Sequence, residues 1–358
     1  MNNNNTTYHP LGDYIRPVDI RNRDLKVTTL LGLSVSKEFM PSIANTIGTD
    51  MSTYKIVGTN QFVYIADTSR RGDKIAIALW TQPEKAIVSS IYTVFEIVDR
   101  EKLLPEYLMM WFRRPEFDRY ARYHSHGSAR EIFDWEEMCA TMVPVPPITE
   151  QRAVVADYEA VARRISVAKR TIATLQDTAQ ALYRKMFVDG IDKEIPMGNI
   201  VRPKKGKNIV REDCIIGKIP VIAGGKTPSC YHNASNTDSP VITISASGAN
   251  AGYIQIHKEK VWAADCSYID RTIYPYIYYC YSILKANQDK IFSMQEGTGQ
   301  PHIYPEHIMQ LLIPDADIDT IKEYNINAEK LFSSVFIAKE EINKLTEIQS
   351  LLLARMGK

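Results

Sequence analysis

The chain has 358 residues, 45% of them apolar, and its 43 Lys and Arg nearly balance its 42 Asp and Glu, which leaves a net charge of +1. This composition indicates a globular protein that is long enough for two domains, each with its own core. The charge argues against a large phosphate-binding footprint, and the absence of an apolar stretch of about 18–20 residues argues against a membrane span.

The first residues and the cysteines bear on where the chain works. Residues 1–7 have no basic region and no apolar run, so we expect a disordered tail there and no signal peptide. The five cysteines form no C-x-x-C pair and are odd in number, which argues against a disulfide framework or a zinc ribbon. The expected location is therefore the cytoplasm.

A first globular unit is predicted at residues 8–143. One helix is expected from Pro105 to about Tyr123, because a proline at a first-turn position precedes a mixed apolar pattern. Short β-like runs lie between turn signals at residues 62–66, 74–79 and 91–98.

Two loops of this unit, residues 68–74 and 120–130, combine Arg, Ser and Gly, and the second also contains His. Such side chains and exposed backbone can reach base edges and phosphates. A charged, solvated loop without function is the alternative interpretation of each.

Residues 144–188 are predicted to form a proline-rich entry and a long helix, with Thr149 as its cap. Apolar residues recur in alternating steps of three and four, which is the seam of a coiled coil. The helix would be roughly 50–60 Å long and needs a partner helix. The residues of this first seam are Val154, Tyr158, Ile165, Ile172, Leu175 and Leu182.

A second globular unit is predicted at residues 189–313. It contains a basic loop at 204–208, a glycine turn at 223–228 and a loop of small residues at 245–252 that lets backbone approach a ligand closely. The glycine turn lacks the G-x-x-x-x-G-K-[ST] spacing of a phosphate-binding loop. The 245–252 loop is expected to occupy the place that residues 69–74 have in the first unit.

The last segment, residues 314–358, is predicted to be the partner helix. Its seam residues are Leu331, Val335, Ile342, Leu345 and Leu352. This seam superposes on the first with an offset of 170 residues, so that Met186 falls on Met356, and Gly127 on Gly297. The starts of the units match with an offset of 186, as Pro10 and Pro196 show. The chain is therefore interpreted as a duplication.

The predicted fold is α+β, with tandem duplicated units separated by two long helices that form an antiparallel intramolecular coiled coil. No motif for methyl transfer, metal-dependent cleavage or hydrolysis is present, so no catalytic residue, metal site or cofactor of its own is expected. Candidate DNA-binding residues are Arg21, Arg23, Lys26, Ser69, Arg70, Arg71, Lys74, Tyr123, Ser125, His126, Arg130, Lys204, Lys205, Lys207, Asn208, Lys226, Ser247, Asn250, Gln300 and His302.

This layout resembles the specificity subunit of Type I restriction–modification enzymes. The resemblance rests on the order of units and helices, on the Pro-rich, Glu-Gln-Arg entry at residues 143–152, and on residues 297–301, which are similar to the matching entry of the second repeat. Residues 313–317 lack the second prolines and the Glu-Gln-Arg.

The resemblance implies that residues 8–143 and 189–313 are target-recognition domains, each reading half of a bipartite, asymmetric site in double-stranded DNA. It implies that the helices set the gap between the half-sites and dock two methyltransferase subunits, which bind S-adenosylmethionine and flip the target adenine. Restriction subunits can join that complex, and the chain itself is not an enzyme. The alternatives are a recognition subunit of an enzyme that cuts on both sides of its site, or a coiled-coil adaptor that does not bind DNA.

Overall fold

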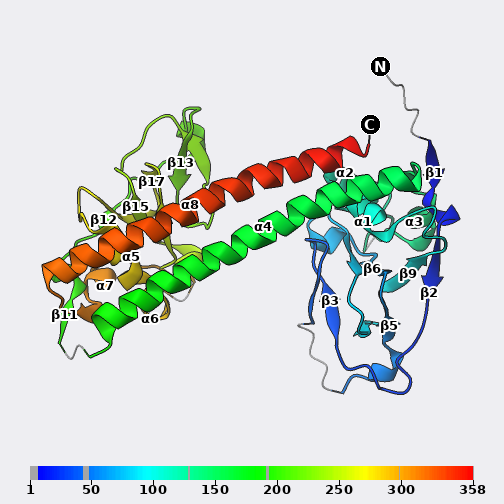
Figure 1. The fold of residues 1–358 in the computed structure, drawn as a ribbon, viewed down its shortest axis with the longest axis horizontal. Helices are drawn as coiled ribbons and strands as arrows, with labels where there is room; N and C mark the ends of the chain where they lie inside the picture. The colour runs from blue at the N-terminus through cyan, green and yellow to red at the C-terminus, as the bar shows by residue number, and fades with distance from the viewer. Residues whose placement is uncertain (1–6, 43–47, 128–129, 191–192, 298, 358) are drawn as a thin grey trace. The chain divides into compact units, whose positions relative to one another are not determined.

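The computed structural model describes residues 7–42, 48–127, 130–190, 193–297 and 299–357, and Figure 1 traces their helices and strands. The chain divides into two compact units, one of Met1–Ile165 with Asn343–Lys358 and the other of Ser166–Ile342. Each unit combines one globular region with parts of both long helices. Of the predicted disordered tail, residues 1–6 lie outside the described residues.

The first unit is built on a four-stranded antiparallel sheet of order β2-β9-β6-β7. Its strands are β2 (Ile15–Val18), β9 (Thr93–Ile97), β6 (Gln61–Ile65) and β7 (Ala76–Trp80). Three strand pairs accompany it: β1 (Tyr8–Pro10) with β10 (Met142–Pro144), β3 (Leu31–Leu33) with β4 (Phe39–Pro41), and β5 (Lys55–Val57) with β8 (Ala86–Val88).

The predicted helix of residues 105–123 is two helices, α1 (Pro105–Arg113) and α2 (Pro115–Tyr123), followed by the short α3 (Trp135–Ala140). The prediction of one helix was wrong because Pro115 has no N–H to donate and forces Arg114 into extended backbone, with φ −68° and ψ 136°. Residues Tyr107 to Phe112 of α1 are all buried, so this helix lies inside the core of the unit.

The second unit repeats this plan. Its four-stranded sheet, also antiparallel, has the order β12-β18-β15-β16. Its strands are β12 (Lys204–Lys205), β18 (Cys266–Asp270), β15 (Val241–Ser245) and β16 (Ile254–His257). Beside it lie a three-stranded sheet of β14 (Cys230–His232), β13 (Ile219–Ile222) and β17 (Trp262–Ala263), and the pair β11 (Glu194–Pro196) with β19 (Leu312–Pro314).

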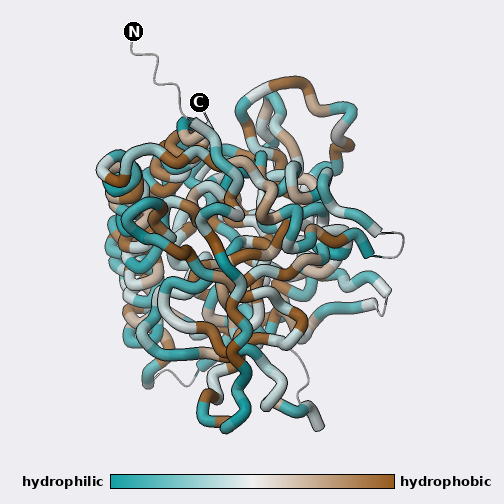
Figure 2. Tube along the Cα trace, turned by 90° about the vertical axis from the view of Figure 1, so that its right-hand side faces the viewer, coloured by the Kyte–Doolittle hydropathy of each residue, from teal (hydrophilic) through white to brown (hydrophobic). Residues whose placement is uncertain are grey.

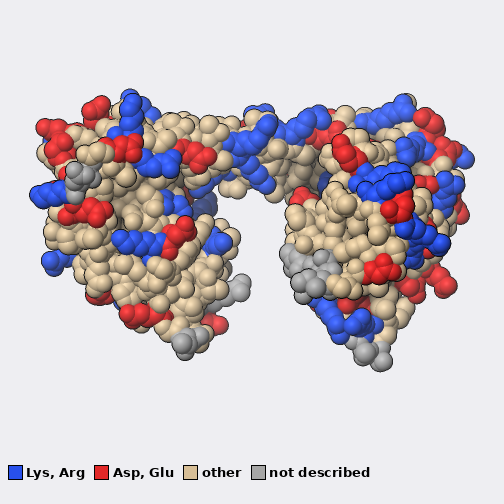
Figure 3. Space-filling view, turned by 90° about the horizontal axis from the view of Figure 1, so that it is seen from below, with Lys and Arg blue, Asp and Glu red and all other residues tan. Residues whose placement is uncertain are grey.

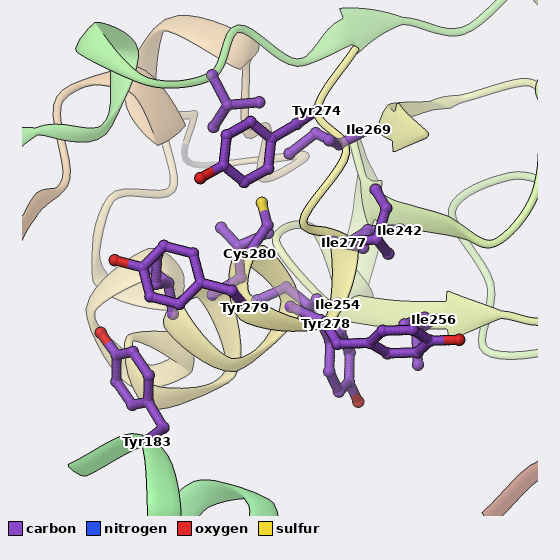
Figure 4. Packing of buried hydrophobic residues seen from close by; sticks show 14 of the residues in the cluster. Tyr183, Ile242, Ile254, Ile256, Ile269, Tyr274, Ile277, Tyr278, Tyr279 and Cys280 are labelled. Atoms are coloured by element: carbon purple, nitrogen blue, oxygen red, sulfur yellow. The ribbon is translucent and has the colours of Figure 1, made fainter. Parts of the chain in front are cut away.

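The helices of the second unit are α5 (Ile277–Ala286), α6 (Gln288–Ser293) and α7 (Pro305–Met309). As in the first unit, two helices follow each other directly: α5 and α6 are separated at Asn287, whose side-chain amide donates to the Ile283 carbonyl oxygen at 3.0 Å. Like α1, α5 is buried on all sides, and Figure 4 shows its Tyr279 extending toward Tyr183 of α4, on the side away from Ile242 and Ile269 of the sheet. Figure 2, coloured by hydropathy, shows brown apolar stretches alternating with teal polar ones over short distances along the trace.

Two long helices account for the predicted seams. Helix α4 (Ile148–Tyr183) continues into a π-helical turn at Arg184–Val188, and Gly190 then adopts a φ of +82°, a left-handed conformation that ends the helix. Helix α8 (Ile318–Arg355) is the second. Thr149 lies inside α4 and is not its cap.

The helices pair in antiparallel fashion. In the second unit the Tyr324 hydroxyl of α8 donates to the Ala179 carbonyl oxygen of α4 at 3.0 Å, and in the first unit Tyr158 shares one core with Leu352 and Met356. The N-terminal part of α8 therefore lies against the C-terminal part of α4, and the C-terminal part of α8 lies against the N-terminal part of α4. All eleven predicted seam residues are buried or half-buried. The predicted α+β fold with paired long helices is confirmed.

Gln151 fixes the entry of α4 to the first unit. Its side chain is fully buried, accepts from the backbone N–H of Leu104 at 2.9 Å, and donates to the carbonyl oxygens of Lys102 and Pro146, both at 2.8 Å. In the second repeat, Asn325 performs a related role, because its side-chain oxygen accepts from Tyr278 N–H at 3.0 Å at the start of α5. The glutamine of the Glu-Gln-Arg motif therefore has a structural function.

Replacing Gln151 with leucine should destabilise the first unit by about 1–3 kcal/mol, because three part-buried backbone groups lose their hydrogen-bond partner. Urea denaturation followed by circular dichroism measures the change. The matched control is Arg152→Leu, since Arg152 is exposed and its ion pair with Glu101 spans 3.2 Å in solvent. Equal effects of the two substitutions would show that the buried hydrogen bonds of Gln151 do not stabilise the entry.

One expectation about the cysteines is corrected. The structure joins Cys214 and Cys230 in a disulfide, although their spacing gave no signal of a pair, while Cys139, Cys266 and Cys280 carry free thiols. None of the helices in the described part of the chain has the length and apolar character needed to cross a bilayer.

Candidate nucleic-acid interface

The two candidate loops of the first unit are held against each other. The Thr68 backbone N–H donates to the Glu131 carbonyl oxygen at 3.1 Å, and the Phe133 N–H donates to that of Ala66 at 2.9 Å. The Thr68 hydroxyl lies 2.8 Å from the Ser125 hydroxyl. The loop between β6 and β7 and the loop after α2 therefore form one surface at one end of the sheet.

Arg122 is the main electrostatic link of this surface. Its guanidinium pairs with Asp73 at 2.7 Å and with Glu131 at 2.6 Å, so one side chain connects both loops. These hydrogen bonds, with Glu131 first and Asp73 second, raise the pKa of Arg122 above its ordinary value. Arg122 was not among the candidate residues, because neither acid lies near it in the sequence.

The structure separates the candidates of these loops into two groups. Arg70, Lys74, Tyr123 and Arg130 are exposed and can reach a ligand. Ser125 differs from these: it is buried, and its hydroxyl donates to the Ala121 carbonyl oxygen at 2.6 Å, so in this structure it supports the loop.

The remaining candidates here are partly engaged. His126 lies 3.3 Å from a carboxylate oxygen of Glu137, and the Ser69 hydroxyl lies 3.4 Å from Asp67. Arg71 is half-buried, and its Nε has no hydrogen-bond partner among the described residues. An Arg with an unsatisfied buried nitrogen is costly to keep, and a ligand that approaches the loop could satisfy it.

Strand β2 runs parallel to β6, because both strands pair antiparallel with β9. The segment after β2, which holds Arg21, Arg23 and Lys26, therefore leaves the sheet at the same end as the loop after β6. Two of them are already paired. Arg21 donates to the Thr53 carbonyl oxygen at 2.7 Å and binds Asp19, whose pKa its hydrogen bond lowers, and Lys26 pairs with Asp24 at 3.1 Å. Arg23 is exposed.

In the second unit, three segments meet around the hairpin loop between β15 and β16. The Gly248 N–H donates to the Pro301 carbonyl oxygen at 3.0 Å, and the Ala246 N–H donates to that of Asp265 at 3.2 Å. The Ser247 hydroxyl donates to the Asp265 carboxylate, so Ser247 is also engaged. The small residues of this loop allow these close backbone approaches.

Two half-buried side-chain amides brace the hairpin loop. Gln288 donates to the Gly252 carbonyl oxygen and Gln295 donates to that of Ala251, both at 2.8 Å. Gly252 has a φ of +82°, which favours glycine, and a side chain there would lie against Ile291. Neither glutamine was predicted, because both come from α6 and the loop after it, which are distant from the hairpin in the sequence.

Basic and polar candidates surround this loop. Lys204 and Lys205 lie exposed on the edge strand β12, Lys207 and Asn208 follow them, and the Lys207 N–H donates to the Ala263 carbonyl oxygen at 2.9 Å. The Lys226 ammonium lies 5.0 Å from the centre of the Tyr253 ring.

Three candidates complete the second surface. Asn250 and His302 are half-buried, His302 stacks on Tyr304 with ring centres 6.0 Å apart, and Gln300 is exposed. Across both units, Figure 3 shows Lys and Arg interspersed with Asp and Glu in that view, which agrees with the near-neutral net charge.

The two surfaces are built in the same way. In the first unit Ile132 forms isolated bridges with both Asp67 and His126, and in the second His302 forms them with Ser247 and Glu296. The loop of residues 245–252 therefore occupies the place of residues 69–74, as predicted. No group of three or more His, Cys, Asp or Glu side chains that could hold a metal ion occurs in the part of the chain that the structure describes.

Comparisons with known proteins agree with this architecture. The chain is similar to the crystal structure of a Type-I restriction-modification system S subunit from M. genitalium, with a TM-score of 0.65 and 16% identity over 99% of this chain and 97% of that one. The HsdS subunit from Thermoanaerobacter tengcongensis matches over 98% of this chain and 96% of its own, with 16% identity and a TM-score of 0.39.

A third solved structure, of complex assembly and conformational transition of the type I R-M system, matches over 98% of this chain and 97% of its own, with 17% identity and a TM-score of 0.43. No family model and no curated protein sequence matches the chain. On the strength of the M. genitalium structure, the chain has the fold of a Type I restriction–modification S subunit over nearly its whole length.

Proposed function

We propose that this chain is the DNA sequence-recognition subunit of a Type I restriction–modification complex. The observation that carries the proposal is the duplicated loop surface, built twice by the same backbone arrangement and bearing different side chains each time. The shared fold with an S subunit supports it.

The differences between the two surfaces give each unit its own half-site. The first presents Arg70, Arg130 and Tyr123, whereas the second presents Lys226, Asn250 and Gln300. An arginine reads guanine through two hydrogen bonds, and an amide reads adenine. Two recognition surfaces with different side chains on one chain recognise an asymmetric, bipartite site in duplex DNA.

The division of labour follows from what the chain carries. Its residues select the site, and two methyltransferase subunits supply S-adenosylmethionine and the chemistry on the adenine, with restriction subunits joining the same complex. Each good base contact gives about 1–3 kcal/mol of discrimination. A few per unit reach the roughly 4–10 kcal/mol that separates specific from non-specific binding. Such a complex works on DNA in the cytoplasm.

The direct test is to co-express the chain with the methyltransferase subunit encoded beside it and to map methylated adenines by long-read sequencing. A split motif with a fixed gap, methylated on both strands, is the expected result. If no methylation occurs, binding of the chain to duplex DNA is measured against salt. A binding constant that shows no log-linear fall with salt would refute DNA recognition.

The proposed role of the helices as a spacer gives a further prediction. Inserting one heptad into α4 after Ile165 and one into α8 after Ile342 preserves the seam and lengthens the pair by about 10 Å. The methylated motif should then gain about three base pairs between its halves, at about 3.4 Å each. The control carries the heptad in α4 only, which mismatches the pair and should abolish methylation. An unchanged gap in the doubly extended chain would mean that the helices do not set it.

A further inference from the structure

Each repeat carries a histidine–glutamate pair at the same place, with the two partners exchanged. In the first unit His126 Nε2 lies 3.3 Å from the Glu137 carboxylate. In the second unit His307 Nε2 lies 3.2 Å from the Glu296 carboxylate. With the offset of 170 residues, His126 corresponds to Glu296, and Glu137 corresponds to His307. The contact is therefore kept although the residue types at both positions differ.

The two pairs are also exposed in the same way. The side chain of the first member is exposed, to 69% in His126 and to 68% in Glu296. Its partner is better shielded, with a side chain that is 26% exposed in Glu137 and 14% in His307. Each shielded partner is the third residue of a short helix, α3 or α7. The exchange therefore reverses the charges and keeps the arrangement.

In the first unit the pair lies at the base of a short loop. The backbones of His126 and Ile132 exchange two hydrogen bonds, of 3.1 and 2.9 Å, and so close residues 127–131 into a loop. Arg130, a candidate for contact with DNA, is exposed on this loop. The contact with Glu137 therefore ties the base of the loop to α3.

The second unit repeats this arrangement. The backbones of Glu296 and His302 exchange hydrogen bonds of 3.0 and 2.8 Å and close residues 297–301 into a loop. Gln300, the candidate that corresponds to Arg130, is exposed on it. The contact with His307 ties the base of this loop to α7.

A second contact orients the shielded partner of each pair. The Tyr304 backbone N–H donates to His307 Nδ1 at 3.4 Å, so the ring hydrogen is on Nε2, which faces Glu296. In the first unit, the other carboxylate oxygen of Glu137 lies 3.1 Å from His124 Nδ1. The helix therefore presents an oriented group, and the residue at the base of the loop completes the pair.

The ion pairs of Arg122, in contrast, are not repeated. Arg122 pairs with Asp73 and Glu131 in the first unit, but it corresponds to Phe292 in the second. Glu131 corresponds to Pro301. Exposed ion pairs add little to stability, so stability alone does not explain a pair that persists with its charges exchanged. A requirement on the position of the loop explains it, because either orientation of the pair fixes the loop base.

We propose that the exchanged His–Glu pair positions the DNA-reading loop of each repeat. This rests on the proposed function, in which Arg130 and Gln300 each contact one half-site. The pair holds the base of its loop against α3 or α7, so less conformational freedom is lost when the loop meets DNA. Its members are positioning residues, because they act through the loop that they hold.

The test exchanges the pair in the second unit. Glu296→His brings two histidines together, His307→Glu brings two carboxylates together, and the double variant has the arrangement of the first unit. Each chain is co-expressed with the methyltransferase subunit encoded beside it, and methylation is measured on a library randomised in both halves of the motif.

Each single variant should lower discrimination in one half of the motif by at least about fivefold, the smallest loss expected for one base contact. The other half, read by the first unit, should be unchanged, and the double variant should recover discrimination. Lys258→Glu is the matched control, because Lys258 pairs with Glu340 at 2.9 Å in the same unit but away from the loop. This substitution also brings two carboxylates together, and it should leave the motif unchanged.

The outcomes separate this inference from the proposed function. Single variants that keep full discrimination, or a double variant as weak as the single ones, overturn the positioning role and leave the proposed function standing. An unaltered chain that yields no split motif overturns both. The urea midpoints of all variants should match that of the unaltered chain, and a lower midpoint in the single variants would assign their effect to folding and overturn the positioning role.

Discussion

Replacing Tyr324 with alanine should destabilise the second unit by about 3–5 kcal/mol, as expected when a buried aromatic is removed and leaves a cavity. Tyr324 is fully buried in the helix pair. Its ring lies 5.4 Å from that of Phe187 and 6.2 Å from that of Tyr279, so the substitution removes packing against both the π-helical turn after α4 and α5. Its hydroxyl donates to the Ala179 carbonyl oxygen at 3.0 Å and lies 2.6 Å from the Ser282 hydroxyl.

The measurement can be made specific to this unit. Trp262 belongs to the second unit, whereas Trp80, Trp111 and Trp135 belong to the first. Urea unfolding followed by fluorescence, in the presence and absence of Trp262→Phe, assigns each transition to a unit. Tyr324→Phe is the matched control and should cost only about 1–3 kcal/mol, the penalty for losing the buried hydrogen bonds of the Tyr324 hydroxyl. Equal midpoints for the two variants would contradict the packing role of the ring.

Arg70→Ala should weaken recognition of one half-site by about 1–3 kcal/mol, or roughly 5- to 150-fold, and leave the other half unchanged. Arg70 is exposed in the hairpin loop of the first unit, which Arg122 and Thr68 hold in place. Lys226→Ala, on the equivalent surface of the second unit, should affect only the opposite half.

Methylation of a library randomised in both halves of the motif measures both variants in one experiment. Thr59→Ala is a suitable control, because its hydroxyl donates to the Gln82 carbonyl oxygen in another loop of the first unit. If Arg70→Ala weakened the sequence requirement in both halves of the motif, the two recognition surfaces would not act independently. Uniformly weaker methylation with an unchanged motif would reassign Arg70 to phosphate contact.

The long helices and the duplication could be predicted from the sequence because their signals are local and repetitive. The heptad of Ile172, Leu175 and Leu182 has the period of a packed helix pair, and each of them is half-buried or buried in the structure. The hairpin loops were predictable for a similar reason, since turn residues separate short β-like runs. The break at Arg114 was also visible, in the proline that follows it, and was missed.

The candidate surfaces could be predicted only as segments. Whether a polar residue of a loop faces solvent depends on partners far away in the sequence, as Ser125 shows with Thr68. Arg122 was missed because Asp73 and Glu131 reach it only through the fold. Gln288 and Gln295 were missed because the carbonyl groups that they bind lie in the loop between β15 and β16, far away in the sequence. The same reason applies to Cys214 and Cys230, which lie 16 residues apart in the sequence and are joined only in the fold.

The assignment of residues 343–358 to the first unit has a consequence for synthesis of the chain. Leu352, Leu353 and Met356 belong to the core that contains α1 and Tyr158, although nearly the whole chain separates them. A ribosome therefore releases the first half of the sequence long before that half can complete its own core. The second unit, whose residues are contiguous, can close earlier, so the part of the chain that is made first is the last to finish folding.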